Sequence, residues 1–149
     1  MNYQTMIMES VKMDGFQIVS SSLFSNERLP IMTIFKDEIS FSREAHGYLN
    51  YCAAIQILIN SEERKIMIKS APSTDENSIT WKNKLKESYT PRFTCPKLTR
   101  PLFSIWGWDI NNRYRAEGRL VKCANKPILL FDFRDAKAYR GKEMLKKDA

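Results

Sequence analysis

Cationic side chains and aromatic rings alternate along the middle of this 149-residue chain, and both kinds of side chain suit a polyanionic partner. Between Trp81 and Arg115, eight Lys and Arg residues stand against two acidic residues, Glu87 and Asp109. Lysine and arginine neutralise phosphates, arginine also hydrogen-bonds guanine edges, and exposed rings stack on unpaired bases. We therefore expect a nucleic-acid-binding surface, for which the candidates are Arg43, Lys82, Lys84, Arg92, Lys97, Arg100, Arg113, Arg115 and Arg119.

The charge of the chain is divided unevenly between its two halves. Residues 1–81 carry 7 Lys and Arg against 10 Asp and Glu, a net charge of −3. Residues 82–149 carry 17 against 7, a net charge of +10, so the whole chain has +7. A basic half attached to a mildly acidic one favours a polyanion such as duplex DNA as the partner. The alternative is a solvated surface with a lysine-rich tail.

Three of the candidate arginines share a side if their segment is a strand. Arg113, Arg115 and Arg119 are separated by even numbers of residues, and alternate residues of a strand point to the same face. We expect them to form a basic stripe. By contrast, Phe103, Trp106 and Trp108 have helical spacing, which favours a place in the core over contact with bases.

No set of residues in the sequence forms a recognisable catalytic or metal site. The single histidine, His46, lacks partners at metal-ligand or catalytic spacing. Asp132 and Asp135 flank a predicted strand, but a magnesium site would need a third ligand, so a solvated strand end is favoured. The five glycines are not grouped into a phosphate-binding loop. We expect no enzyme activity, no catalytic residues, no metal and no cofactor.

The overall composition predicts a folded protein of a reducing compartment. An apolar fraction of 43% is sufficient for a core, and no apolar run is long enough for a membrane helix. We also expect no signal peptide at the N-terminus. The three cysteines, Cys52, Cys95 and Cys123, are odd in number and widely spaced, which favours the cytoplasm.

The pattern of apolar and polar residues predicts an α+β fold of antiparallel β-hairpins with short helices. Residues 53–70 and 113–133 each hold two apolar runs that a short polar turn separates. Ser42 is suited to cap a helix from Arg43 to Leu49, and Pro96 to open one over residues 97–108. The two halves thus share one order of elements: strand, helix, strand, turn, strand.

This shared order predicts one domain, residues 1–149, built from two units at about residues 31–72 and 92–133. We interpret residues 73–91 as a linker or long excursion, and residues 134–149 as a basic tail that is a frayed helix or disordered. A unit of this size is too small to bury a sufficient core alone, so we expect the two units to pack together with pseudo-twofold character.

The first unit resembles the swapped-hairpin DNA-binding domains of the AbrB proteins and the MazE-type antitoxins. The resemblance rests on ISFSREAHGYL followed by IQILINSEERKIMIKSAP, and covers about residues 31–72. Ile39 to Glu44 stand at the family's strand and helix start, although Ser42 replaces its usual proline. Two family chains interlace into one barrel-like unit, so the resemblance implies a pseudo-dimer barrel within this chain. It also implies that Arg43 faces phosphates.

The whole chain is similar to short integrase-like or recombinase-associated proteins on mobile elements of Gram-positive bacteria. That similarity implies a regulator or an accessory factor for recombination, with a recombinase or another protein as a further partner. The alternative function is a protein-interaction or antitoxin-like module whose basic face binds an acidic protein. The sequence leaves the oligomeric state open.

Overall fold

The computed structural model describes residues 10, 12–19, 29–81 and 91–145, and these form a mainly antiparallel α+β fold. Its elements in chain order are β1 (Ile31–Ile34), β2 (Glu38–Phe41), α1 (Arg43–Tyr48), β3 (Ala54–Asn60), β4 (Lys65–Ser70), β5 (Ile79–Thr80), β6 (Arg92–Thr94), α2 (Pro96–Ile105), β7 (Arg113–Cys123), β8 (Lys126–Asp132), η3 (Phe133–Asp135), β9 (Lys137–Arg140) and β10 (Glu143–Leu145). The expected fold class is confirmed at this level.

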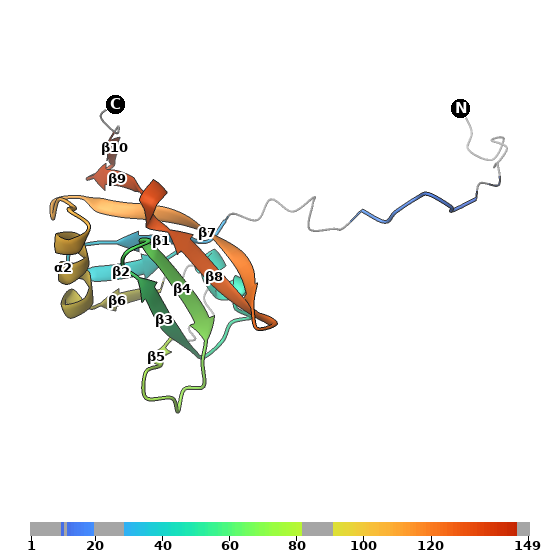
Figure 1. The fold of residues 1–149 in the computed structure, drawn as a ribbon, viewed down its shortest axis with the longest axis horizontal. Coiled ribbons are helices and arrows are strands. Elements are labelled where there is room, and N and C mark those ends of the chain that lie inside the picture. The colour runs from blue at the N-terminus through green and yellow to red at the C-terminus, as the bar shows by residue number, and fades with distance from the viewer. Residues whose placement is uncertain (1–9, 11, 20–28, 82–90, 146–149) are drawn as a thin grey trace.

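The strands of both halves belong to one curled sheet with the shape of a half-barrel. Its order among the described residues is β5-β3-β4-β8-β7-β1-β2-β6, and β9 with β10 extends from β7. Figure 1 shows β3, β4 and β8 as the front wall and β1, β2 and β6 as the back wall. The long strand β7 passes between them because its first part pairs with β1 and its second part with β8.

Both predicted hairpins are confirmed. In the first hairpin, β3 pairs with β4 from Ile55 opposite Ser70 to Asn60 opposite Lys65. In the second, β7 pairs with β8 from Gly118 opposite Phe131 to Cys123 opposite Lys126. The second hairpin closes through Ala124 and Asn125, whose φ angles of 51° and 65° suit the twist of a two-residue hairpin turn. Alternating apolar residues and a short polar turn were sufficient to locate each pair, because both features are local.

Aromatic rings from opposite walls meet inside the half-barrel. The rings of Phe41 in β2 and Phe131 in β8 lie 6.1 Å apart, and the ring of Trp81 lies 5.1 Å from that of Phe41. Trp81 is fully buried, so it belongs to the core and has no surface for a base. The prediction of a linker over residues 73–91 therefore needs correction in part, since Ile79–Thr80 pairs with β3. Residues 82–90 lie outside the described part.

α1 and α2 lie at opposite ends of β2. Leu102 and Phe103 of α2 and its C-cap residue Trp106 are buried in the core at the end where β2 begins. The core position expected for Phe103 and Trp106 is confirmed, and Trp108, beyond the helix, packs against the core while partly buried. At that end of β2, the hydroxyl of Thr99 donates to the carbonyl of Lys36 at 2.6 Å, within the β1–β2 turn. α1 follows Phe41, where β2 ends, and buries Ala45 and His46.

The prediction of a frayed or disordered tail from residue 134 is wrong as far as residue 145. η3 turns the chain, β9 pairs with β7, and β10 pairs with β9. Backbone pairing at the open flank of β7 gives this polar segment a strand structure that its side chains alone do not indicate. Residues 146–149 lie outside the described part.

Gly118 is predicted to be required where β7 exchanges one partner for the other. A Cβ atom at this position would lie 2.6 Å from Cε1 of the fully buried Phe131. We expect Gly118→Ala to lower the free energy of unfolding by about 1–3 kcal/mol, since a packed ring must shift. Urea unfolding followed by tryptophan fluorescence measures this change.

Gly47→Ala provides the matched control for that substitution. Its Cβ would lie 3.4 Å from the hydroxyl of the exposed Tyr51, and alanine favours the helix by about 0.5–1 kcal/mol. We expect unchanged or slightly higher stability. Equal stability of the Gly118→Ala variant and the wild type would refute the close contact.

Candidate nucleic-acid interface

The outer face of β7 displays the arginines that the strand spacing predicted to share a side. Ala116 and Gly118 are buried toward the interior, so Arg113, Arg115 and Arg119 point outward from the half-barrel. Glu117 stands among them on the same face. Within the described residues, none of the three arginines forms an ion pair, so their charges are available to a ligand.

The outer basic row is a line of directly paired residues that crosses five strands. Its members, from β6 to β9, are Arg92, Ser40, Thr33, Arg115 and Lys137. Paired residues of an antiparallel sheet point to the same face, and neighbouring strands lie about 4.8 Å apart. The backbones of Arg92 and Arg115 are therefore about 14 Å apart, with the short Thr33 and Ser40 side chains between them.

Tyr139 of β9 orders the arginines of β7. The guanidinium carbons of Arg113 and Arg115 both lie 5.2 Å from the centre of its ring. Arg113 also donates a hydrogen bond to the carbonyl of Gly141, between β9 and β10. Cation–π and hydrogen-bonding contacts of this kind leave the positive charge in place, so they hold the side chains without neutralising them.

Lys137 and Tyr139 lie in the segment predicted to be a tail, so they were not among the predicted site residues. The signal that could have located them is the alternation of Lys137, Ala138, Tyr139 and Arg140, in which the long side chains at 137 and 139 share one face. This face continues that of β7 through the pairs Arg113–Tyr139 and Arg115–Lys137.

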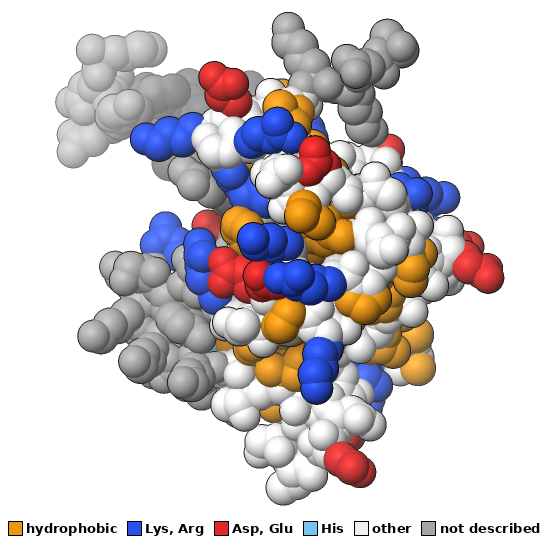
Figure 2. Space-filling view, turned by 90° about the vertical axis from the view of Figure 1, so that its left-hand side faces the viewer, with side chains coloured by type: hydrophobic (Ala, Val, Ile, Leu, Met, Phe, Trp, Pro, Cys, Tyr) orange, Lys and Arg blue, Asp and Glu red, His pale blue; other side chains and the backbone are white. Residues whose placement is uncertain are grey.

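Carboxylates pair with other candidate cations. Arg92 contacts Glu38 at 3.0 Å, Arg100 contacts Asp37 at 2.7 Å, and Arg43 contacts Glu44 at 3.7 Å. The first two pairs join the basic half of the chain to the acidic half. Figure 2 shows Lys and Arg interleaved with Asp and Glu on the side of the molecule that carries α2. Part of the charge asymmetry is therefore matched by ion pairs between the two halves.

The candidate cations Arg43 and Arg100 lie at opposite ends of β2. Arg43 opens α1 beyond the end of β2, whereas Arg100 lies on α2, against the turn where β2 begins. Lys97 is exposed in the first turn of α2. Lys82 and Lys84 lie outside the described residues, so that part of the prediction has no structural counterpart.

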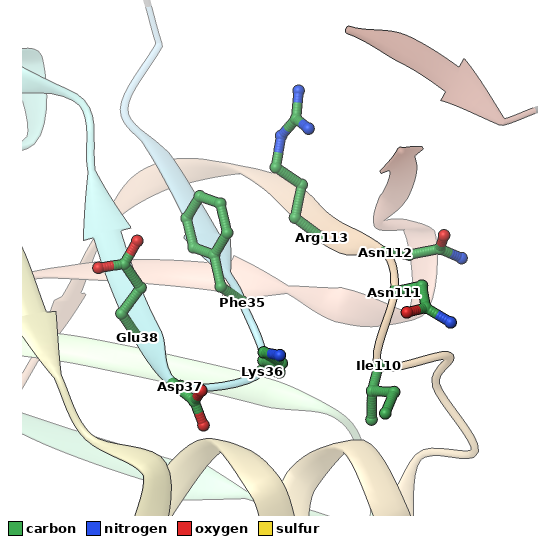
Figure 3. A pocket seen from close by; sticks show the side chains of 8 residues that line it. All are labelled: Phe35, Lys36, Asp37, Glu38, Ile110, Asn111, Asn112 and Arg113. Carbon is green, nitrogen blue, oxygen red and sulfur yellow. The ribbon is translucent and has the colours of Figure 1, made fainter. Parts of the chain in front are cut away.

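A pocket of about 440 Å³ lies beside the outer basic row. Its lining comes from the β1–β2 turn and from the segment that enters β7: Phe35, Lys36, Asp37, Glu38, Ile110, Asn111, Asn112 and Arg113. Figure 3 shows the side chains of Phe35 and Arg113 extending to the same side of the sheet. On that side, the guanidinium carbon of Arg92 lies 5.7 Å from the centre of the Phe35 ring.

The groups that were weighed for catalysis have structural partners. His46 is buried, its Nε2 lies 3.1 Å from the carbonyl of Cys52, and its ring lies 5.3 Å from that of Trp81. Asp132 pairs with Arg134 at 2.8 Å, and this hydrogen bond lowers the pKa of Asp132 below its ordinary value. Within the described ranges, no three His, Cys, Asp or Glu residues are grouped so that they could hold a metal.

The comparisons with known proteins identify no relative of this chain. No family model matches it, and neither a curated protein nor a solved structure matches. Among the described residues, no helix has the length and apolar character needed to cross a membrane.

The Asp37–Arg100 pair gives a testable prediction on electrostatics. The hydrogen bond from Arg100, followed by its charge, lowers the pKa of the Asp37 carboxyl. A carboxyl whose pKa is lowered by folding adds stability above its unfolded pKa, and this contribution is lost as the pH falls. We expect Arg100→Gln to raise the pKa of Asp37 toward its ordinary value in a carboxyl NMR titration.

Asp132 is the internal control for that titration. Its pKa is lowered chiefly by Arg134, so Arg100→Gln should leave it unchanged. An unchanged pKa of Asp37 in the variant would show that the pair does not form in solution.

Proposed function

We propose that this protein is a non-enzymatic DNA-binding protein in which Arg113, Arg115 and Arg119 of β7, together with Lys137 of β9, contact the phosphates of duplex DNA. The observation that carries the proposal is the outward position of Arg113, Arg115 and Arg119 on β7. Arg43, Arg92 and Arg100 form ion pairs with carboxylates. The three arginines of β7 have no such pair among the described residues, so their charges are available to a ligand.

The spacing of these arginines suits a regular polyanion. Successive residues on one face of a strand are about 6.8 Å apart, so Arg113 and Arg119 span about 20 Å. Lys137 pairs directly with Arg115 and widens the stripe to a second strand. Long cationic side chains on such a surface can meet several phosphates at once, and each contact releases counterions from the DNA.

The pairing of the two units supports a pseudo-dimer barrel of the AbrB type. Each unit has the order strand, helix, strand, turn and strand, and corresponding strands pair with one another: β2 with β6, and β4 with β8. Ile39 pairs with Phe93, flanked by Glu38–Thr94 and Ser40–Arg92, so this pairing is symmetric about its central residues. Antiparallel pairing of equivalent strands is what a twofold axis between two units would produce.

The proposal assigns the protein a regulatory role, or an accessory role in recombination on a mobile element. A catalytic role has little support among the described residues. Burial raises the pKa of the Cys52 and Cys95 thiols, which disfavours the nucleophilic thiolate, and the ring of His46 is enclosed. All three cysteines are unpaired, which suits action in the reducing cytoplasm.

An apolar row on the front wall favours a second candidate, a protein-interaction module. Leu58, Met67 and Leu130 are direct neighbours on β3, β4 and β8, and the row ends at Arg119 on β7. Leu58 is 36% exposed, and the other two apolar residues are half-buried. Apolar side chains beside a cation suit a protein partner with an acidic rim.

Removal of two outward arginines should weaken DNA binding in a salt-dependent manner. We expect Arg113→Ala/Arg115→Ala to lower the affinity for duplex DNA similarly across sequences. The slope of log K against log salt should fall by about 0.9 for each lost phosphate contact. Fluorescence titrations at several salt concentrations measure both quantities.

Lys122→Ala/Lys126→Ala is the charge-matched control, because these residues lie at the far tip of the β7–β8 hairpin. The control should lose less affinity than the arginine variant, with both folded by circular dichroism. Equal affinities of the arginine variant and the wild type would remove Arg113 and Arg115 from the interface. Wild-type protein without salt-sensitive binding would favour the protein-interaction candidate.

A further inference from the structure

The pocket beside the outer basic row combines two kinds of surface that one nucleotide requires. Apolar side chains line it from two sides: the half-buried ring of Phe35 at the β1–β2 turn, and the side chain of Ile110, which is 60% exposed, in the segment that enters β7. Arg113 stands at the edge of the pocket, next to the other cationic side chains of β7 and β9. A volume of about 440 Å³ lies in the range of about 300–1,000 Å³ found for ligand pockets.

Hydrogen bonds within the protein fix the two segments that line the pocket, so the pocket forms without a ligand. Phe35 N–H donates to the carbonyl of Glu38 at 2.8 Å, and Cys95 N–H donates to that of Asp37 at 2.8 Å. On the opposite side, the side-chain oxygen of Asn112 accepts from Arg140 at 2.9 Å. Both sides are therefore fixed by segments distant in sequence, and a preformed site loses little entropy on binding.

We propose that this pocket binds one unpaired base of a single-stranded nucleic acid, with the base against Phe35 and Ile110 and the flanking phosphates on Arg113 and Arg115. This inference rests on the proposed function and extends the same surface. It adds single-stranded segments, such as an overhang next to a duplex, to the DNA that the protein recognises.

The polar lining of the pocket determines which bases fit. Asp37 and Glu38 each give one oxygen to an arginine at 2.7 and 3.0 Å, and a carboxylate has the capacity to accept further hydrogen bonds. Acceptors of this kind pair with the exocyclic amino groups of cytosine, adenine and guanine, which thymine lacks. The pocket therefore favours cytosine over thymine, while the carboxylates disfavour a phosphate in the same place.

Fluorescence anisotropy with labelled oligonucleotides tests this inference on the full chain. The probes are oligo(dC) and oligo(dT) of about 12 nucleotides, and a short duplex of mixed sequence. We expect the wild type to bind oligo(dC) at least fivefold more tightly than oligo(dT). Phe35→Leu, which keeps an apolar side chain but removes the ring, should weaken oligo(dC) binding about tenfold. The same substitution should leave duplex binding unchanged.

A second pair of variants keeps the test independent of any effect of Phe35 on folding. Ile110 lines the pocket and is 60% exposed, whereas Ile105 lies on α2, outside the pocket, and is 63% exposed. Ile105→Ala is therefore the matched control for Ile110→Ala. Only Ile110→Ala should weaken oligo(dC) binding.

The outcomes separate this inference from the proposed function. Duplex binding with no preference for oligo(dC), or with no effect of Phe35→Leu and Ile110→Ala, overturns the pocket inference alone. Absence of binding to every probe overturns the proposed function and the inference with it. Competition by free dCMP as effective as that by unlabelled oligo(dC) overturns the single-strand inference in favour of a free nucleotide.

Discussion

The rest of the structure depends on β7, which among the described strands is the one shared by the two walls of the half-barrel. Its first residues pair with β1 and β9, and its later residues pair with β8. Gly118 lies where β7 changes partners: its N–H donates to the carbonyl of Pro30, which precedes β1, and it pairs directly with Phe131 of β8. The ring of Phe131 lies close against Gly118, and glycine in a strand commonly marks such a close approach.

The alternation of side chains along β7 then couples the core to the surface. Small residues, Ala116 and Gly118, face inward and leave room for the rings that fill the half-barrel, so the flanking cations Arg115 and Arg119 face outward with Glu117 between them. Cross-strand pairing places Lys137 and Tyr139 beside them. The basic stripe thus follows from the geometry that closes the core, while the ion pairs of Asp37 and Glu38 link the two halves beside the pocket.

Local patterns predicted the hairpins, both helices and the shared face of Arg113, Arg115 and Arg119, because alternation and helix starts are properties of neighbouring residues. The sequence did not predict β9, because its residues become a strand only through backbone pairing with β7. Nor did it predict that Arg92 and Arg100 pair with carboxylates 54 and 63 residues away. A count of charges contains no information about such distant partners, so it could not distinguish the cations that pair with carboxylates from those of β7.

The central claim is that nucleic acid contacts the outer face of β7 and β9. An NMR titration of isotope-labelled protein with a short duplex tests it most directly, because each backbone amide reports on its own surroundings. The account predicts that chemical-shift changes concentrate at residues 113–119 and 137–139, and that they diminish as salt is added. Changes confined to α1 around Arg43 and to the β3–β4 hairpin, or no changes at all, would contradict it.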